Sequence, residues 1–173
     1  MLQQIYPTVA HPYPYELNKD LQFAAAHYVP SEAAGKCQRM HGHTYFANIT
    51  IAGDMLDSSG FLVNFAEVKK LIHDRFDHTV LNEDTDSFSN ETPDRFPTTE
   101  VVARTIAELV QAHLDRTENK PVVVQVFLRE TPTSYIVYRP NSQPKPQLQP
   151  EPQQPNLQSQ PQPHLQLKEG DSR

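Results

Sequence analysis

Alternation of apolar and polar positions in the first third of the chain predicts two β-strands. From Tyr15 to His27 the apolar side chains fall on every second residue, which is the period of a strand with one buried face. A second run, from about His43 to Ala52, is rich in β-branched and aromatic residues. Turn-forming residues lie between the two runs, so we expect the strands to pair as a hairpin.

The middle of the chain has the spacing of amphipathic helices. Apolar residues recur every three or four positions from Phe65 to Phe76 and again from Val102 to Leu114, so each segment predicts a helix with one buried face. Thr98, followed by Glu100, suits the start of the second helix. Residues 82–96 between the helices are rich in Asp, Glu, Ser and Asn, and they predict a long acidic loop.

Two further strands complete the predicted fold. Val122 to Leu128 is strongly β-prone, and Ser134 to Tyr138 follows a break at Pro132. The order is then ββααββ, which predicts an α+β fold: a four-stranded antiparallel sheet with two helices on one face. The edges of so small a sheet favour association. We therefore expect oligomerisation to close the sheet.

Composition separates a C-terminal tail from this domain. Half of the 16 prolines lie from Pro140 onward, among many glutamines. Such a segment cannot bury enough apolar surface to offset the entropy lost on ordering it. We therefore expect a folded domain over residues 1–140 and a disordered Gln/Pro-rich tail over residues 141–173.

Charge, hydropathy and cysteine content argue against several classes of protein. The 21 acidic residues outnumber the 15 basic ones, which argues against a general nucleic-acid binder. No apolar run is long enough to span a bilayer, and the first residues lack the pattern of a secretory signal. The single cysteine excludes an intrachain disulfide. These features predict a soluble, cytoplasmic protein with no nucleic-acid or membrane partner.

Candidate metal ligands lie where the second strand begins. His41 and His43 point to the same face of an extended chain, and Gly42 between them leaves room for a close approach. His27, at the end of the first strand, is a candidate third ligand. Three imidazoles leave the fourth tetrahedral position of a zinc ion open, as in a catalytic site. A closed site with Cys37 as fourth ligand, and no chemistry, is the alternative, since a His-x-His pair alone is a weak signal.

Two further polar features fall at predicted element ends, where a scaffold presents side chains to a cleft. Asp77 and His78 close the first helix, so the imidazole could move protons while the carboxylate sets its tautomer. A purely structural helix-end cluster is the alternative for this pair. Glu130 ends the third strand, and a half-buried carboxylate there suits the paired N–H donors of a pterin or guanine.

Six motifs in a fixed order resemble the 6-pyruvoyltetrahydropterin synthase/QueD family, over Leu17 to Arg139. The motifs are Phe23-Ala24-Ala25-Ala26-His27, Cys37-x-x-x-His41-Gly42-His43, Leu62-Val63-Asn64-Phe65, Phe76-Asp77-His78, Pro97-Thr98-Thr99-Glu100 and Arg129-Glu130-Thr131-Pro132-Thr133-Ser134-Tyr135. The spacing from Cys37 to His41 is similar to that of the bacterial branch, the 6-carboxytetrahydropterin synthases of queuosine biosynthesis. Asn64 departs from the Asp that relatives often carry, which puts helix capping in question more than chemistry.

This resemblance implies a fold, an assembly and a reaction. The fold is the T-fold (tunnelling fold), in which trimers close a β-barrel and two trimers stack as a homohexamer with active sites between subunits. The implied Zn²⁺ ligands are His27, His41 and His43. The implied catalytic residues are Cys37, Asp77, His78 and Glu130. The implied substrate-binding residues are Glu130 and Thr131. The implied lyase converts 7,8-dihydroneopterin triphosphate to 6-carboxy-5,6,7,8-tetrahydropterin, acetaldehyde and triphosphate.

Two other functions stay open. The same fold could make 6-pyruvoyltetrahydropterin, a reaction that releases no acetaldehyde. The protein could also be a non-catalytic, zinc-stabilised module that binds a pterin or purine and is indifferent to substitution of Cys37. Lys36 and Arg39 flank the cysteine motif and are candidates for contact with the triphosphate.

Overall fold

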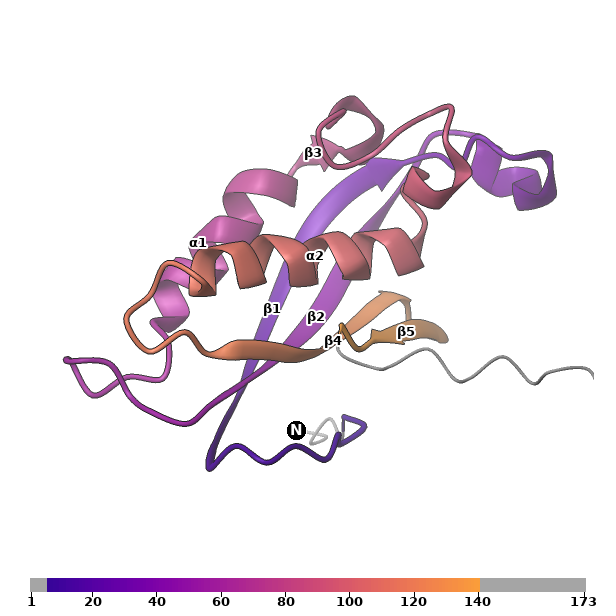
Figure 1. Ribbon diagram of the computed structural model, residues 1–173. Coiled ribbons are helices and arrows are strands. Elements are labelled where there is room, and N and C mark those ends of the chain that lie inside the picture. The colour runs from indigo at the N-terminus through magenta and orange to yellow at the C-terminus, as the bar shows by residue number, and fades with distance from the viewer. Residues whose placement is uncertain (1–5, 141–173) are drawn as a thin grey trace, which may run out of the picture. The chain divides into compact units, whose positions relative to one another are not determined.

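Five strands form one sheet in the computed structural model, which describes residues 6–140. Their order across the sheet is β3-β1-β2-β4-β5, and the neighbouring pairs are antiparallel except for β1 and β3. Both α-helices lie on one face of the sheet (Figure 1), as predicted. The predicted tail lies outside the described residues. Along the chain the elements are β1 (Tyr15–His27), the 3₁₀ helix η1 (Glu32–Gln38), β2 (His41–Gly53), α1 (Phe65–Phe76), β3 (Thr79–Val80), the 3₁₀ helices η2 (Leu81–Glu83) and η3 (Pro93–Arg95), α2 (Thr99–Leu114), β4 (Val122–Thr131) and β5 (Ser134–Tyr138).

The hairpin of β1 and β2 is the frame on which the site is built. Its pairing runs without a shift from Tyr15 opposite Gly53 to His27 opposite His41. β1 has the bounds that the alternation predicted, whereas β2 begins at His41 and so includes both histidines of the His-Gly-His motif. One end of the hairpin therefore carries three imidazoles.

The structure corrects the predicted number of strands from four to five. The additional strand, β3, has two residues and pairs in parallel with Ala25 and Ala26 of β1. Two residues are too few to show the alternation of a strand, so the sequence pattern could not reveal it. The predicted loops also contain short 3₁₀ helices. Cys37 lies in η1, η2 overlaps the start of the acidic segment, and η3 lies near the end of that segment.

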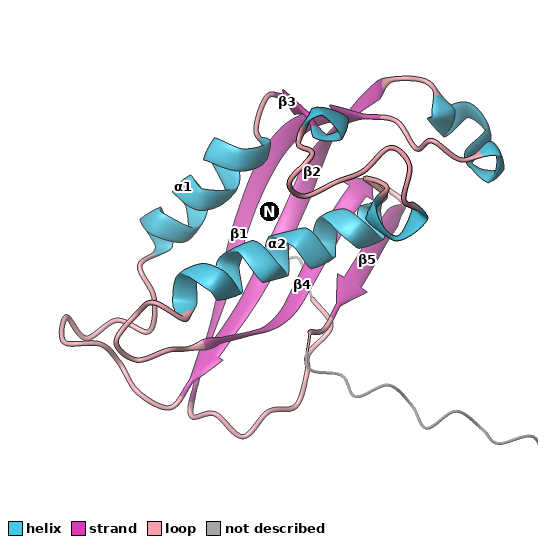
Figure 2. Cartoon of the chain, turned by 45° about the horizontal axis from the view of Figure 1, so that its top comes forward, coloured by secondary structure: helices cyan, strands magenta, loops and turns pink. Residues whose placement is uncertain are grey.

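The core lies between the two α-helices and the sheet (Figure 2). Phe23 of β1 stacks on Tyr45 of β2 with ring centroids 4.9 Å apart, and Phe76 of α1 packs 5.7 Å from Phe23. Burial of each such side chain contributes on the order of 1.5–3 kcal/mol to stability. This cluster supports the hairpin directly below the histidines. Further residues with no exposed surface include Ile49, Ile51, Val68, Ile72, Val102, Ile106, Val110 and Leu114.

Both α-helices are capped at their first turn. Asn64 Oδ1 accepts a hydrogen bond from the Ala66 N–H over 3.0 Å, and its Nδ2 donates to Glu67 over 3.1 Å. Thr98 Oγ1 accepts from the Val101 N–H over 3.4 Å. Asn64 therefore still caps α1, which answers the question raised by its departure from Asp. Within residues 6–140 no helix is long and apolar enough to cross a membrane.

The face of the sheet without helices is partly covered by the segment before β1. Tyr6 meets Phe127 of β4 edge to face, with ring centroids 5.1 Å apart. Burial, together with a hydrogen bond to Asp20, raises the pKa of Tyr6 to about 12. Phe46 and Tyr135 remain 40% and 56% exposed. These two rings are apolar surface that a partner could cover.

Candidate metal and substrate site

Three histidines meet at one end of the β1–β2 hairpin. His27 is directly opposite His41, and His43 is opposite Ala25. Side chains two residues apart on a strand share a face, so all three imidazoles lie on the helix-covered side. Their ring centroids are 4.5, 4.9 and 5.3 Å apart, and one nitrogen of each ring lies within 4.8 Å of the others. The structure thus brings the three predicted ligands together.

Backbone carbonyls orient two of these imidazoles. His27 Nδ1 lies 2.7 Å from the Pro97 carbonyl oxygen, and His41 Nδ1 lies 2.7 Å from that of Arg39. A carbonyl oxygen only accepts, so the proton of each neutral ring is on Nδ1 and the lone pair is on Nε2. His43 Nε2 is buried and has no hydrogen-bond partner in the described chain. This donor set fits zinc, whose histidine ligands commonly donate their second N–H to a carbonyl.

Burial favours the neutral form of His27 and His43. Desolvation lowers the pKa of His27 and of His43, although the nearby carboxylate of Glu130 acts in the opposite direction. The neutral imidazole is the form that binds a metal ion. These two imidazoles could therefore bind a metal ion at neutral pH without first releasing protons.

A phenol and a carboxylate lie against the histidines. Tyr45 Oη is 3.4 Å from Glu130 Oε1 and 3.5 Å from His27 Nε2. Glu130 Oε1 is also 3.5 Å from His27 Nε2 and 4.0 Å from His43 Nε2. Burial first, and then Glu130, raises the pKa of Tyr45, so the phenol keeps its proton. Tyr45 was not among the predicted site residues, although its position two residues after His43 places it on the same strand face.

Glu130 lies at an irregularity of the sheet. The pairing of β4 with β5 shifts between Arg129 and Thr131, so Glu130 lies at a bulge or irregularity of that ladder. Leu128, which pairs with Ala47 of β2, is buried in the core, and Glu130 is two residues further along β4. Because side chains two residues apart on a strand share a face, Glu130 points to the same face as the histidines.

Two cavities lie beside residues 42–44. One, of about 450 Å³, is lined by Glu130 and Thr131 together with residues of β2. The other, of about 520 Å³, is lined by His78 with residues of β1, β2 and β3. His43 borders both cavities. Within one described chain, Glu130 and His78 therefore face different cavities.

Asp77 and His78 join the end of α1 to β1. Asp77 Oδ1 accepts from the Ala24 N–H over 2.8 Å, and the His78 N–H donates to the Ala24 carbonyl over 2.6 Å. The Ala24 N–H, and then His78, lower the pKa of Asp77. His78 has a φ of 61° and a side chain that is 83% exposed, with its Nδ1 3.1 Å from Asp77 Oδ2. The pair clamps α1 to the sheet, as the structural alternative expects, yet leaves the imidazole accessible for proton transfer.

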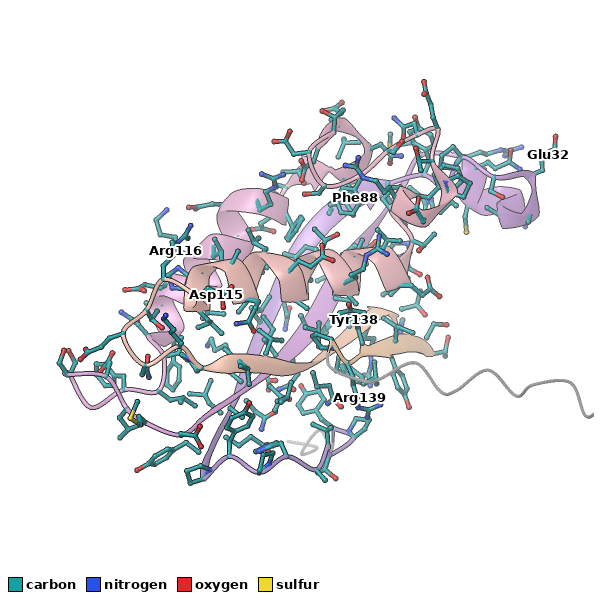
Figure 3. The ribbon with its side chains drawn as sticks, viewed as in Figure 1. Glu32, Phe88, Asp115, Arg116, Tyr138 and Arg139 are labelled. Carbon is teal, nitrogen blue, oxygen red and sulfur yellow. The ribbon has the colours of Figure 1, made fainter. Side chains whose placement is uncertain are left out.

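Cys37 is exposed on η1 and is not part of the histidine group. Its carbonyl accepts from the Val29 N–H over 2.8 Å, whereas its thiol has no hydrogen-bond partner in residues 6–140. Glu32, at the start of η1, points away from the sheet (Figure 3). Lys36 and Arg39 are exposed on either side of the cysteine. This arrangement favours an open three-histidine site over a closed site with a fourth, sulfur ligand.

A mostly antiparallel sheet with helices on one face and three histidines at a hairpin end defines an α+β protein with a candidate metal centre. The chain belongs to the 6-pyruvoyl tetrahydropterin synthase family, whose model matches residues 16–141. Its fold is the T-fold, so the predicted family and fold are confirmed.

Three similar proteins place the chain within this family. The 6-carboxy-5,6,7,8-tetrahydropterin synthase of Bacillus subtilis (strain 168) is 63% identical over 140 residues, which cover 81% of this chain and 95% of that protein. The 6-pyruvoyl tetrahydrobiopterin synthase of Drosophila melanogaster is 34% identical over 114 residues, covering 62% and 64%. The solved structure of Caenorhabditis elegans 6-pyruvoyl tetrahydropterin synthase matches with a TM-score of 0.56 and 27% identity, covering 72% and 94%.

Proposed function

We propose that this protein converts 7,8-dihydroneopterin triphosphate and one water molecule to 6-carboxy-5,6,7,8-tetrahydropterin, acetaldehyde and triphosphate. The observation that carries the proposal is the 63% identity over 140 residues to the Bacillus subtilis enzyme of that name. The three-histidine group supports dependence on zinc. This reaction would place the protein in queuosine biosynthesis in the cytoplasm.

The proposed Zn²⁺ ligands are His27, His41 and His43. Zn²⁺ held there would act as a Lewis acid toward the oxygens of the substrate side chain. The Pro97 and Arg39 carbonyls fix two of the rings through their Nδ1 atoms. The ligands would thus be in place before substrate arrives, which lowers the entropy cost of bringing the metal and the substrate into the reactive geometry.

Glu130 is the proposed anchor of the pterin ring. A carboxylate offers two acceptor oxygens, which match the amino group and the ring N–H of a pterin. Glu130 and Thr131 line the cavity of about 450 Å³, which is within the usual range for small-molecule sites. Anchoring the ring there would fix the distance between the substrate side chain and the metal ligands.

Cys37 is the proposed proton acceptor for the substrate side chain, with His78 as its proton-transfer partner. A thiol takes a proton only as thiolate, and a nearby cation or metal ion favours that form. Asp77 is charged and lies against His78 Nδ1, so it orients the imidazole that relays protons. The exposure of both groups leaves them open to substrate.

The complete site is proposed to form between subunits of a homohexamer built from two trimers. Glu130 and His78 line different cavities of one chain, and the Cys37 thiol has no partner within residues 6–140. Exposed rings of Phe46 and Tyr135 lie on the face of the sheet that carries no helix. Closing that face inside a barrel would bury the rings and bring sites of neighbouring chains together.

Acetaldehyde release distinguishes the candidate functions. Incubation of the zinc-loaded protein with 7,8-dihydroneopterin triphosphate is expected to release acetaldehyde and triphosphate in equal amounts. The second candidate, 6-pyruvoyltetrahydropterin synthesis, is supported by the similarity to the Drosophila enzyme and releases triphosphate without acetaldehyde. A non-catalytic module releases neither. Either of the last two outcomes overturns the proposed reaction.

A further inference from the structure

The hydroxyl of Tyr45 lies between two groups with separate tasks in the site. It is 3.5 Å from His27 Nε2, the ring nitrogen that faces the metal position, and 3.4 Å from Glu130 Oε1. These two atoms are themselves 3.5 Å apart. The three atoms thus form a nearly equilateral triangle, and the phenol is its only O–H.

One proton therefore serves two acceptors. His27 Nδ1 holds the ring proton against the Pro97 carbonyl, which leaves a lone pair on Nε2. The carboxylate of Glu130 is also an acceptor. The Tyr45 hydroxyl can donate to only one of them at a time. The side chains of His27 and Glu130 are 2% and 20% exposed, so the group that does not receive the proton has little contact with water, and an unpaired polar atom is costly there.

A metal ion changes this competition. When the lone pair of His27 Nε2 is used by a metal, that nitrogen no longer accepts the phenol proton. The Tyr45 hydroxyl would then donate to Glu130 Oε1 alone. This contact would fix the orientation of the carboxylate, while Oε2 and the second lone pair of Oε1 remain for the paired N–H donors of a pterin.

We propose that Tyr45 is a positioning residue that couples metal occupancy of the histidine group to the orientation of Glu130, so that zinc strengthens pterin binding through the Tyr45 hydroxyl. The inference rests on the proposed function only in assigning the pterin to Glu130. Such coupling is reciprocal, because two ligands that favour the same arrangement strengthen each other's binding.

The substitution Tyr45→Phe removes the hydroxyl and keeps the ring. The ring stacks on Phe23 with an interplanar angle of 15°, and a phenylalanine preserves that contact. The matched control is Tyr138→Phe, on β5 (Figure 3), whose ring packs against the same core and whose hydroxyl has no hydrogen bond in the described chain.

The test compares neopterin, a fluorescent pterin without triphosphate, as a ligand of zinc-loaded and metal-free protein. In the wild type and in Tyr138→Phe, zinc is expected to lower the Kd for neopterin. In Tyr45→Phe that zinc-dependent ratio is expected to shrink about threefold to tenfold, as the loss of one hydrogen bond implies. Zinc stoichiometry and the visible spectrum of the Co²⁺-substituted protein are expected to stay unchanged, which a general loss of structure would not allow.

Two outcomes would contradict the inference in different ways. If wild-type protein binds neopterin and Tyr45→Phe keeps the full zinc-dependent ratio, Tyr45 does not couple the groups, and the proposed function stands. If wild-type protein binds no neopterin in either form, the assignment of the pterin to Glu130 fails as well.

A second measurement uses the wild-type sequence, so it does not depend on whether Tyr45→Phe folds. With ¹³C at the tyrosine Cζ atoms, one signal is expected to shift on addition of Zn²⁺ because the phenol changes its acceptor. The same signal is expected to shift in Glu130→Gln. Zinc binding with no shifted tyrosine signal overturns the proposal.

Discussion

Backbone carbonyls orient two imidazoles of the histidine group, His27 and His41, through their Nδ1 atoms. The three histidines could be predicted because two belong to one His-Gly-His motif and the third ends a strand. Their backbone partners could not, because Pro97 is 70 positions from His27 in the sequence and a carbonyl leaves no mark in residue type. Tyr45 was predictable from strand period alone, but its role depends on Glu130, 85 positions away.

Asp77 offers a pH-dependent test at the same scale. Its pKa is lowered, mainly by the Ala24 N–H, so its stabilising contribution is full above the ordinary carboxyl pKa and is lost as pH falls through the lowered value. Asp77→Ala is expected to reduce the free energy of unfolding by about 1 kcal/mol at pH 7. The deficit relative to wild type is expected to shrink below about pH 4.

Urea unfolding at about pH 7, 4 and 3, test points on both sides of the ordinary carboxyl pKa, would measure this difference. Asp74→Ala is the control, since Asp74 lies in the last turn of α1 and is exposed, with Lys70 as its only ion-pair partner among residues 6–140. A deficit for Asp77→Ala that stays constant with pH would show that the carboxylate charge is not its source.

Elements with a long, regular period were predicted most faithfully. β1 and α1 have the predicted bounds, and α2 begins directly after the predicted cap at Thr98. β3, η2 and η3 were missed because two or three residues cannot display a period. Their positions come from tertiary pairing, as when β3 adds to the edge of β1 directly after His78.

The start of α1 gives a prediction about one element. Asn64→Ala removes the acceptor for the Ala66 N–H and is expected to cost about 1 kcal/mol of folding free energy. Asn64→Asp keeps an acceptor at the helix N-terminus and is expected to stay close to wild type. Chemical denaturation of both variants checks this. If both variants lose the same folding free energy, the Asn64 side-chain amide stabilises the helix mainly by donating to Glu67, rather than by accepting from the Ala66 N–H.

At the scale of the whole molecule, one chain carries the parts of the proposed site without gathering them. Glu130 with Thr131 and His78 line separate cavities, and Cys37 lies on η1 outside the histidine group. The sequence could name these residues from motifs, but a motif carries no information on which chain supplies each residue to a site. In the proposed hexamer, the packing of subunits would decide which chain supplies each residue.

Mixed oligomers test whether sites are shared. Cys37→Ala and His78→Ala are each expected to be inactive alone. If one site takes Cys37 and His78 from different subunits, random mixing of the two variants is expected to restore about a quarter of wild-type activity, because about one site in four then carries both residues. Activity is measured as acetaldehyde release after co-refolding. A mixture that stays inactive would place both residues in the same chain's contribution to the site.

The proposed chemistry requires that three histidines hold the zinc ion while the Cys37 thiol stays free of it. The decisive measurement is zinc content together with acetaldehyde release for wild type, His43→Ala and Cys37→Ala. We expect His43→Ala to lose both, because two imidazoles hold zinc much more weakly than three. We expect Cys37→Ala to keep its zinc and lose turnover. Loss of zinc from Cys37→Ala to the same extent as from His43→Ala would contradict the proposed site, because the sulfur would then be a ligand.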